Sequence, residues 1–345
     1  MTEELRIGAM NLLKGCANLS ASDRILIISE DEKLGWYKDN LTEALKYFAK
    51  ELGIKVELLK VGAPEEENID RIRQLSCKYD CMIYLSRLGD QRRFENIHSC
   101  KTVMSYVRNA ETLASSFGCA DYAAHLDLKT VLDDIFRKTK KIEISCPKGT
   151  KLSGEFKQVW FEQPDVATLR FPMVVHAPIS AISFEGYVIL SGHITSTGSQ
   201  VYEPASLELK EDTKVFISNG KIAQITGCKE DVENINDHYR VVAKKFNIDA
   251  KVVHSWHSGI HEGLDPKSMK FIDADHWSNS VFGSPRYLHF HTCGDYAPGE
   301  ICWVVKEPTV KVDGISLWEK GRINFFEFDP LLQCREQWPD LQKFH

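Results

Sequence analysis

"RILIISEDEKLGWYKDNLTEALKYFAKELGIKVELLKV", residues 24–61, predicts a strand, a helix and a second strand in that order. Its first six residues form a short apolar run that is typical of a fully buried strand. Residues 40–53 then repeat apolar side chains at helical spacing, with Asn40 suited to cap the helix and Gly53 to end it. Residues 55–61 read as the next strand. This order predicts two parallel strands joined by a right-handed crossover.

The segments that follow extend the same pattern. Residues 66–76, "EENIDRIRQLS", predict a second helix, and residues 81–86, "CMIYLS", predict a third buried strand. A longer helix is expected over residues 121–138. The chain therefore begins with an α/β domain that has a Rossmann-like parallel sheet. Neither G-x-G-x-x-G nor G-x-x-x-x-G-K-[ST] occurs at the first strand–helix turn, so the sequence gives no support for a nucleotide site.

The pattern changes near residue 141. Residues 141–154, 168–192 and 213–227 are rich in strand-forming residues and are punctuated by Gly and Pro, and Asn219-Gly220 predicts a two-residue hairpin turn. A helix is expected near residues 229–246, and "RINFFEF" (322–328) reads as a late strand. We therefore expect two domains, an α/β domain over residues 1–140 and an α+β, sheet-dominated domain over residues 141–345.

Composition narrows the class of protein. The 345 residues have a net charge of −6 and a hydrophobic content of 43%, which describes an ordinary globular chain without the basic surface that nucleic-acid binding needs. No apolar run approaches the ~20 residues of a membrane span, and the N-terminus lacks a signal-peptide pattern. Ten irregularly spaced cysteines favour reduced thiols. We expect a cytoplasmic protein that has neither a nucleic acid nor a membrane as its partner.

Histidines are concentrated in one part of the second domain. Six of the twelve lie between residues 254 and 291. His257 and His261, with the adjacent Glu262, resemble a scrambled H-E-x-x-H metal motif. That motif needs a helix to bring both imidazoles to one face, and Gly259 and Gly263 disfavour a helix here.

A second part of this concentration is "YLHFHTCGDYAPGEICWVV", residues 287–305. His289 and His291 point to the same face of the predicted strand, and the carboxylates Asp295 and Glu300 follow. First-row metals are often held by ligands in such a pattern. Histidines that line a polar pocket, or that make hydrogen bonds in the core, would give the same pattern, so both interpretations stay open.

Several motifs in residues 141–315 resemble, in order, the thermophilic-type aminopeptidases and their relatives, the 2,5-dihydroxypyridine dioxygenases. "FPMVVHAP" is similar to the family's P-x-G-E-V-[FY]-x-A-P segment, and "SGIHEGLDP" resembles its E-L-G-I-G-x-N-P loop. "YLHFHTCG" resembles the G-T-x-H strand, and "ICWVVKEPTVKVDG" resembles the segment that carries H-x-D. Between the first two of these segments, "FEGYVILSG" resembles the family's next strand and "VFISNGKIAQITG" resembles its hairpin. The resemblance implies the two-domain fold and a homo-oligomer.

Carried over residue by residue, the resemblance implies that most metal ligands are missing. The ligand positions fall on Met173, Gly259, Trp303 and Val305, and only the histidine of the G-T-x-H strand remains, as His289. Met, Gly, Trp and Val cannot replace the hydration of a divalent ion. Such changes would turn a charged cavity into a more apolar one that suits an aromatic or peptide ligand.

The sequence thus favours a non-catalytic, pseudoenzyme-like protein that binds a peptide without a cofactor or a metal. A precursor peptide of a biosynthetic pathway is the ligand that this hypothesis suggests. Its binding pocket is predicted to comprise Met173, His257, His261, Glu262, His289, His291, Asp295 and Trp303. The alternative is a mononuclear enzyme, dioxygenase-like with iron or aminopeptidase-like with zinc, whose relocated site combines these histidines with Glu262, Asp295 or Glu300. A third hypothesis keeps the histidines as structural residues. The peptide could bind either along a sheet edge or in the cleft that the family resemblance implies.

Overall fold

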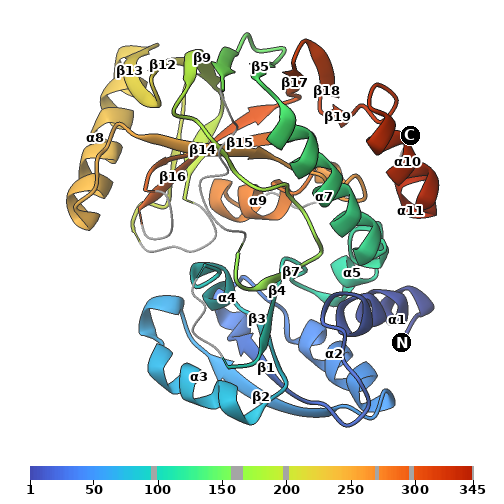
Figure 1. Cartoon of the computed structure of the whole chain (residues 1–345). Coiled ribbons are helices and arrows are strands. Elements are labelled where there is room, and N and C mark those ends of the chain that lie inside the picture. Colours follow the sequence, from blue (N-terminus) through green and yellow to red (C-terminus); the bar gives the residue numbers. More distant parts are fainter. Residues whose placement is uncertain (95–98, 157–165, 197–201, 269–271, 295–298, 344–345) are drawn as a thin grey trace. The chain divides into compact units, whose positions relative to one another are not determined.

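The computed structural model describes residues 1–94, 99–156, 166–196, 202–268, 272–294 and 299–343 (Figure 1). The chain divides into two compact units, of which unit 1 comprises Met1–Leu126 and Asp165–Val174 and unit 2 comprises Asp127–Pro164 and Val175–His345. Compared with the expected domains, unit 1 lacks the residues after Leu126 and gains a short later segment.

Unit 1 is built on a sheet of five strands in which every neighbouring pair is parallel. In spatial order the strands are β2 (Lys55–Val61), β1 (Arg24–Glu30), β3 (Cys81–Leu85), β4 (Lys101–Ser105) and β7 (Leu169–Phe171). The Rossmann-like α/β prediction is confirmed. The late segment belongs to unit 1 because β7 adds to the open edge of β4.

The helices of unit 1 are α1 (Glu3–Met10), α2 (Asp39–Glu51), α3 (Ile69–Leu75), α4 (Arg87–Gln91), α5 (Ala110–Leu113) and α6 (Ser116–Cys119). Helix α2 buries the apolar stripe that the sequence predicts, including Leu45 and Phe48. Its N-terminal cap is Lys38, so the prediction that Asn40 caps it is wrong. The Asn40 side chain instead accepts a hydrogen bond from the Ala110 amide, which fixes it to a neighbouring helix.

Unit 2 contains two antiparallel sheets, as the prediction of a sheet-dominated α+β domain requires. Sheet B runs β13 (Lys221–Thr226), β12 (Thr213–Ser218), β9 (Phe184–Leu190), β6 (Lys151–Glu155), β5 (Lys141–Ser145), β17 (Thr309–Val312), β18 (Ile315–Glu319) and β19 (Arg322–Ile323). Sheet C runs β11 (Ser206–Glu208), β10 (His193–Thr195), β16 (Glu300–Lys306), β15 (Tyr287–Cys293), β14 (Val253–Ser258) and β8 (Ile179–Ser180).

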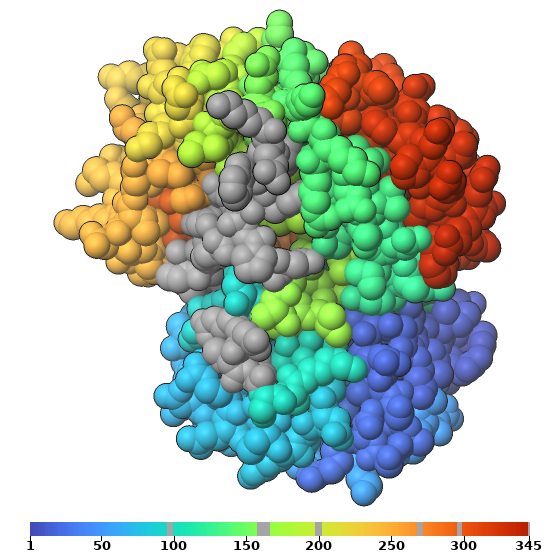
Figure 2. All heavy atoms as spheres, viewed as in Figure 1, coloured from blue at the N-terminus to red at the C-terminus, as the bar shows by residue number. Residues whose placement is uncertain are grey.

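The remaining helices are α7 (Tyr122–Lys138), α8 (Lys229–Phe246), α9 (Ala274–Val281), α10 (Asp329–Gln337) and α11 (Pro339–Gln342). Trp338 donates a hydrogen bond of 2.8 Å from Nε1 to Asp127 Oδ2, which fastens α10 and α11 to α7. Figure 2 shows the side chains of these C-terminal helices (red) on the surface beside those of α7 (green). Within the described ranges, no helix has both the length and the apolar character that crossing a membrane requires.

The C-terminal strand is shorter than the predicted residues 322–328. Strand β19 ends at Ile323, and α10 begins at Asp329 with Pro330 in its first turn. Proline favours that position because its missing N–H has no partner there in any helix. The chain therefore leaves sheet B early, and Phe326 is 65% exposed rather than packed in a strand.

The predicted hairpin at Asn219-Gly220 is confirmed and makes β13 the edge of sheet B. Both turn residues have positive φ, 51° and 66°, as a two-residue turn of this kind requires. A Cβ on Gly220 would also lie 2.8 Å from the Ile182 Cα, so a larger residue would force the backbone apart. After the turn, β13 runs back antiparallel to β12. The other side of β13, away from β12, is left next to α8.

Candidate functional site

The three central strands of sheet C carry two different faces. In the antiparallel register, His257 on β14 lies opposite His289 on β15, and Phe290 lies between Trp256 and Trp303. Because neighbouring residues of a strand point to opposite faces, His257, His289 and His291 share one face. Trp256, Phe290 and Trp303 share the other.

The three imidazoles form a close group, which we call the histidine cluster. The His257 ring centroid is 5.6 Å from that of His289 and 4.9 Å from that of His291. The side chain of Phe282, which follows α9, packs edge-on against both His257 and His289. All three histidines are buried, so little of the cluster is exposed to solvent.

One carboxylate lies beside the cluster. His291 Nδ1 is 3.3 Å from Glu300 Oε1, and both side chains are buried. Helix α9 covers this face of the sheet, where Val281 and Trp277 pack with Cys302 and Val304. The arrangement places a carboxylate and three imidazoles in a space that apolar side chains separate from water.

His289 is the most isolated of the three histidines. Neither of its ring nitrogens has a hydrogen-bond partner among the described residues. Burial, together with the like charges of the neighbouring His291 and His193, lowers the pKa of His289 to about 3. Burial also lowers the pKa of His193 to about 4. His289 is therefore neutral at ordinary pH and resists protonation.

The donor set does not match a metal centre. Across the part of the chain that the structure describes, no group of three His, Cys, Asp or Glu side chains is arranged to hold an ion. Iron and zinc sites in proteins need at least that many convergent ligands. Among the described residues, which do not include Asp295, the histidine cluster does not present the complete ligand set of the alternative prediction.

The other predicted pocket residues lie elsewhere. Trp303 points to the opposite face of sheet C and donates a hydrogen bond of 2.7 Å to the Tyr239 hydroxyl. Glu262 accepts a hydrogen bond from the Ile323 amide on β19, and burial raises its pKa to about 7. Met173 is a buried residue of unit 1.

His261 and Asp295 are the two remaining residues of the predicted site. His261 is fully buried, and its amide donates a hydrogen bond to the Gly283 carbonyl. Asp295 lies outside the described residues. The structure thus brings together His257, His289 and His291, and it adds Glu300 from the alternative set.

Gly259 occupies the position that the family resemblance aligns with a metal ligand. A Cβ there would lie 2.2 Å from the Ser284 carbonyl oxygen and 2.4 Å from the Gly283 carbonyl carbon. Contacts that short do not occur, and both obstacles are backbone atoms that cannot rotate away. No ligand side chain could occupy this position without a shift of the main chain.

His176, in "FPMVVHAP", is a buried histidine that sequence reasoning did not single out. Its Nε2 accepts a hydrogen bond of 2.9 Å from the Ser258 amide, and its Nδ1 lies 2.7 Å from the Ala177 carbonyl oxygen. This pattern requires a neutral ring with its proton on Nδ1. The His176 ring packs at tilted or edge-on angles against Phe136, Trp256 and Trp318, so it serves the core of unit 2.

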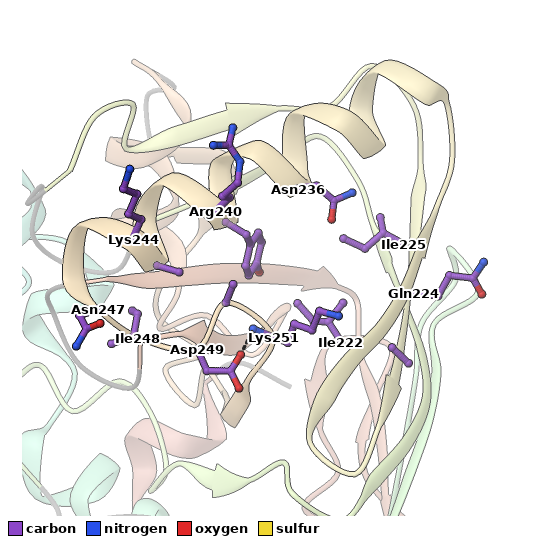
Figure 3. A pocket seen from close by; sticks show the side chains of 14 residues that line it. Ile222, Gln224, Ile225, Asn236, Arg240, Lys244, Asn247, Ile248, Asp249 and Lys251 are labelled. Atoms are coloured by element: carbon purple, nitrogen blue, oxygen red, sulfur yellow. Dashed lines mark hydrogen bonds between the residues drawn. The ribbon is translucent and has the colours of Figure 1, made fainter.

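Unit 2 also contains an open groove that the sequence prediction missed. It has a volume of about 590 Å³ and is lined by β13, by α8 and by the segment Asn247–Lys251. Figure 3 shows Ile222 and Ile225 of β13 facing the groove from one side, with side chains of α8 above them. We call it the α8–β13 groove.

The groove has an apolar base and a basic rim. Ile222, Tyr239 and Ala243 are buried in its lining, whereas Arg240, Lys244 and Lys251 are exposed around it. The acidic Asp249 is held by Lys221 at 3.0 Å. Asn236, Arg240 and Lys244 recur every four residues, which is the sequence signal that could have indicated one polar helix face over the groove.

Comparisons with known proteins give a relation at the level of the fold. No protein-family model matches the sequence, and no curated protein matches it. The structure is similar to that of 2,5-dihydroxypyridine dioxygenase from Pseudomonas putida KT2440, with a TM-score of 0.65 and 12% sequence identity over 93% of this chain and 96% of that one. It is also similar to AmpT from Thermus thermophilus, with a TM-score of 0.58 and 12% identity over 93% of this chain and 98% of that one.

These similarities cover nearly the whole of each chain. At 12% identity they establish a shared fold and leave the chemistry of this chain open. The fold is thus compatible both with the binding function and with the enzymatic alternative that the sequence suggests. The resemblance read from the sequence motifs holds for the architecture, because the chain has one α/β unit and one sheet-dominated unit.

Proposed function

We propose that this chain is a peptide-binding protein without catalytic activity, and that it binds an extended peptide in the α8–β13 groove. The observation that carries the proposal is the combination, in one place, of a sheet edge, a groove of about 590 Å³ and a basic rim. The histidine cluster, which the sequence favoured as a pocket wall, is buried and gives less support to a binding role.

The sheet edge supports binding by strand addition. Strand β13 is the last strand of sheet B, and within the described residues its strand partner is β12. Near the hairpin, the Ile222 amide already donates to the Lys251 carbonyl, so the chain itself begins to cover this edge. An extended peptide could continue along the rest of β13 with main-chain hydrogen bonds.

The side chains that line the groove favour a peptide in which acidic residues alternate with apolar ones. Because successive residues of a strand point to opposite faces, every second side chain of the peptide would meet the apolar base of the groove. The others would lie near Arg240, Lys244 and Lys251. This rim is basic although the whole chain carries a net charge of −6, which favours aspartate or glutamate at those positions.

The lack of catalysis rests on the ligand positions. The resemblance aligns metal ligands with Gly259, Trp303 and Val305, and the backbone around Gly259 leaves no space for a side chain. Trp303 is committed to the opposite face of sheet C by its hydrogen bond to Tyr239. These positions support loss of the chemistry that the enzymes of this fold carry out.

Fluorescence anisotropy tests the proposal. The probe is a labelled peptide of about nine residues that alternates valine with aspartate, compared with the same peptide carrying lysine for aspartate. We expect the acidic peptide to bind roughly tenfold more tightly or better. Failure of both peptides to bind, or preference for the lysine peptide, would contradict the proposal.

A pair of matched variants locates the binding. Arg240→Glu with Lys244→Glu reverses two charges on the rim and should weaken binding by roughly tenfold. Lys210→Glu with Lys229→Glu makes the same change in net charge at exposed positions outside the groove and should leave affinity unchanged. Hydrogen exchange adds a second readout, because bound peptide should slow exchange in β13 and leave β19, at the opposite edge of sheet B, unaffected.

Elemental analysis tests the enzymatic alternative. Protein purified without a His tag should contain substoichiometric iron and zinc, because the described donors do not converge on an ion. Stoichiometric iron or zinc that disappears in His289→Ala would overturn the proposal in favour of a mononuclear enzyme.

A further inference from the structure

The chain itself covers part of the open edge of β13. After α8 the chain turns back along this edge, where the Ile222 amide donates to the Lys251 carbonyl at 2.8 Å. One step further, Lys221 pairs with Val252 in an antiparallel bridge. We call residues 249–253 the edge segment. The hairpin end of β13 is therefore unavailable to a peptide.

The edge segment is held in place by its connections. The Val253 amide donates to the Gly220 carbonyl at 2.8 Å, and the Val252 carbonyl accepts a hydrogen bond from the Cys293 amide of β15. From Val253 the chain continues as β14, which pairs with β15 in sheet C. A peptide could displace the edge segment only by breaking these bonds. The segment therefore sets a fixed limit to where a peptide can pair with β13.

Four residues of β13 remain beyond this limit. They are Ala223–Thr226, and each of them is at least partly exposed. A peptide that adds to the edge can pair with these residues before it meets the edge segment. If it ran on along the same line, it would overlap the Lys251 backbone. A chain end fits this place better than a continuous chain does.

The direction of the peptide decides which of its ends meets the edge segment. Every neighbouring pair of strands in sheet B is antiparallel. The edge segment also runs antiparallel to β13. Antiparallel pairing is the more stable per residue and the more common in proteins. A peptide with this direction lies ahead of Lys251 on the same line and points its carboxyl terminus toward it.

The groups at this point suit a carboxylate. Lys251 is exposed and lines the groove next to Ile222 (Figure 3). The nearby Asp249 carboxylate accepts hydrogen bonds from the Lys251 amide at 2.9 Å and from the Lys221 ammonium at 3.0 Å. Both bonds lower the pKa of Asp249 from its ordinary value, so this carboxylate is engaged by its own chain. A terminal carboxylate would accept a charge-assisted hydrogen bond from the Lys251 ammonium.

We propose that the α8–β13 groove binds the carboxyl terminus of its peptide, with the terminal carboxylate at Lys251 and the preceding residues paired antiparallel to Ala223–Thr226. This inference rests on the proposed function and narrows the ligand from an acidic peptide segment to an acidic chain end. The edge segment sets the limit, the direction of sheet B selects the carboxyl end, and Lys251 supplies the opposite charge. Strand addition and capture of a terminal carboxylate are both established modes of peptide recognition.

Fluorescence anisotropy with matched peptides tests the inference. Two forms of the valine–aspartate peptide of about nine residues carry the label at the amino end and differ only in a free carboxylate or an amide at the carboxyl end. We expect the amide to bind roughly tenfold more weakly. A third peptide, amidated and with one more aspartate beside the label, restores the net charge and should bind as weakly as the amide. Equal affinity of the first two peptides, or recovery of affinity in the third, would overturn the inference.

Unlabelled competitors test the direction of the peptide. Peptides with a free carboxylate should compete about equally with an acetylated or a free amino end, because that end lies away from the edge segment. Stronger competition by the free amine would place the amino end beside Asp249 and would show that the peptide runs the other way.

A matched pair of lysine variants assigns the carboxylate to Lys251. Lys251→Gln removes the ammonium at an exposed position and should reduce the preference for the free carboxylate from roughly tenfold to about twofold or less. Lys229→Gln, at an exposed position outside the groove, should leave this preference unchanged. A preference that survives in full in Lys251→Gln would contradict the inference.

The outcomes separate this inference from the proposed function. If neither the free nor the amidated peptide binds the native chain, the peptide proposal fails and the inference fails with it. If both bind equally and the Arg240→Glu, Lys244→Glu variant weakens both, the groove binds an internal peptide segment, and only the inference about the chain end is wrong.

Discussion

The two faces of sheet C are made by the same three strands, yet they use burial in opposite ways. On one face Trp256, Phe290 and Trp303 are each 0% exposed. On the other, His289 and His291 are 3% and 8% exposed. Burying an aromatic side chain stabilises the fold. Burying an imidazole removes its hydration, and this cost is offset only where its nitrogens make hydrogen bonds in the folded chain. Burial alone therefore does not tell which face stabilises unit 2.

The largest effect that would sharpen this comparison is expected on the aromatic face. Trp303→Ala should lower the free energy of unfolding by about 3–5 kcal/mol, because it removes a large side chain from a fully buried position. Urea unfolding measures the loss. The Trp303→Phe variant is the matched control, since it keeps most of the apolar volume and leaves the Tyr239 hydroxyl without its donor. Equal losses in the two variants would show that the hydrogen bond, rather than packing, dominates.

The next effect is expected on the histidine face and depends on pH. The pKa of His289 is about 3 in the folded chain and near 6.5 in the unfolded chain, so between these values the unfolded chain binds more protons. The free energy of unfolding then falls as pH falls. His289→Leu removes this dependence, and relative to the native chain it should gain about 2 kcal/mol between pH 6.5 and pH 4.5.

Urea unfolding of both proteins over that pH range measures the difference. His257, His291, His193 and Glu300 surround the site and remain in both proteins, so their own titration largely cancels. At neutral pH, where His289 is uncharged, the two proteins should be of similar stability. Stability curves that stay parallel as pH falls would show that His289 becomes protonated in the folded chain and that the face is less dry than we infer.

The same alternation explains what could be predicted from the sequence. The i, i+2 spacing of His289 and His291 placed both on one face correctly, because strand geometry is local. Trp303 was grouped with them because it lies in an aligned motif. The register pairs Trp303 with Phe290, between the two histidines, and so turns it to the opposite face. The register is set by pairing between segments that are distant along the chain, and a single sequence does not reveal that pairing.

The fold shows the same division between local and distant information. The strand–helix–strand order of residues 24–61 was predicted because each element has its own periodicity. The three-residue strand β7 joins unit 1 through pairing with β4, which lies more than sixty residues earlier. The α8–β13 groove also depends on which strand ends a sheet. The spacing of Asn236, Arg240 and Lys244 in the sequence indicates the helical side of the groove, whereas no such pattern indicates the side formed by the strand.

The smallest of the three effects separates two buried histidines that differ in their partners. His176 is 0% exposed and its Nε2 accepts a hydrogen bond from the Ser258 amide, whereas the nitrogens of His289 have no partner among the described residues. His176→Leu should therefore cost about 1–3 kcal/mol at neutral pH, because it leaves a buried amide without an acceptor. His289→Leu leaves no such group. Urea unfolding at one neutral pH compares the two variants directly. If both cost the same, the loss comes from the change of side-chain shape, and hydrogen bonding does not distinguish structural histidines from those of the histidine cluster.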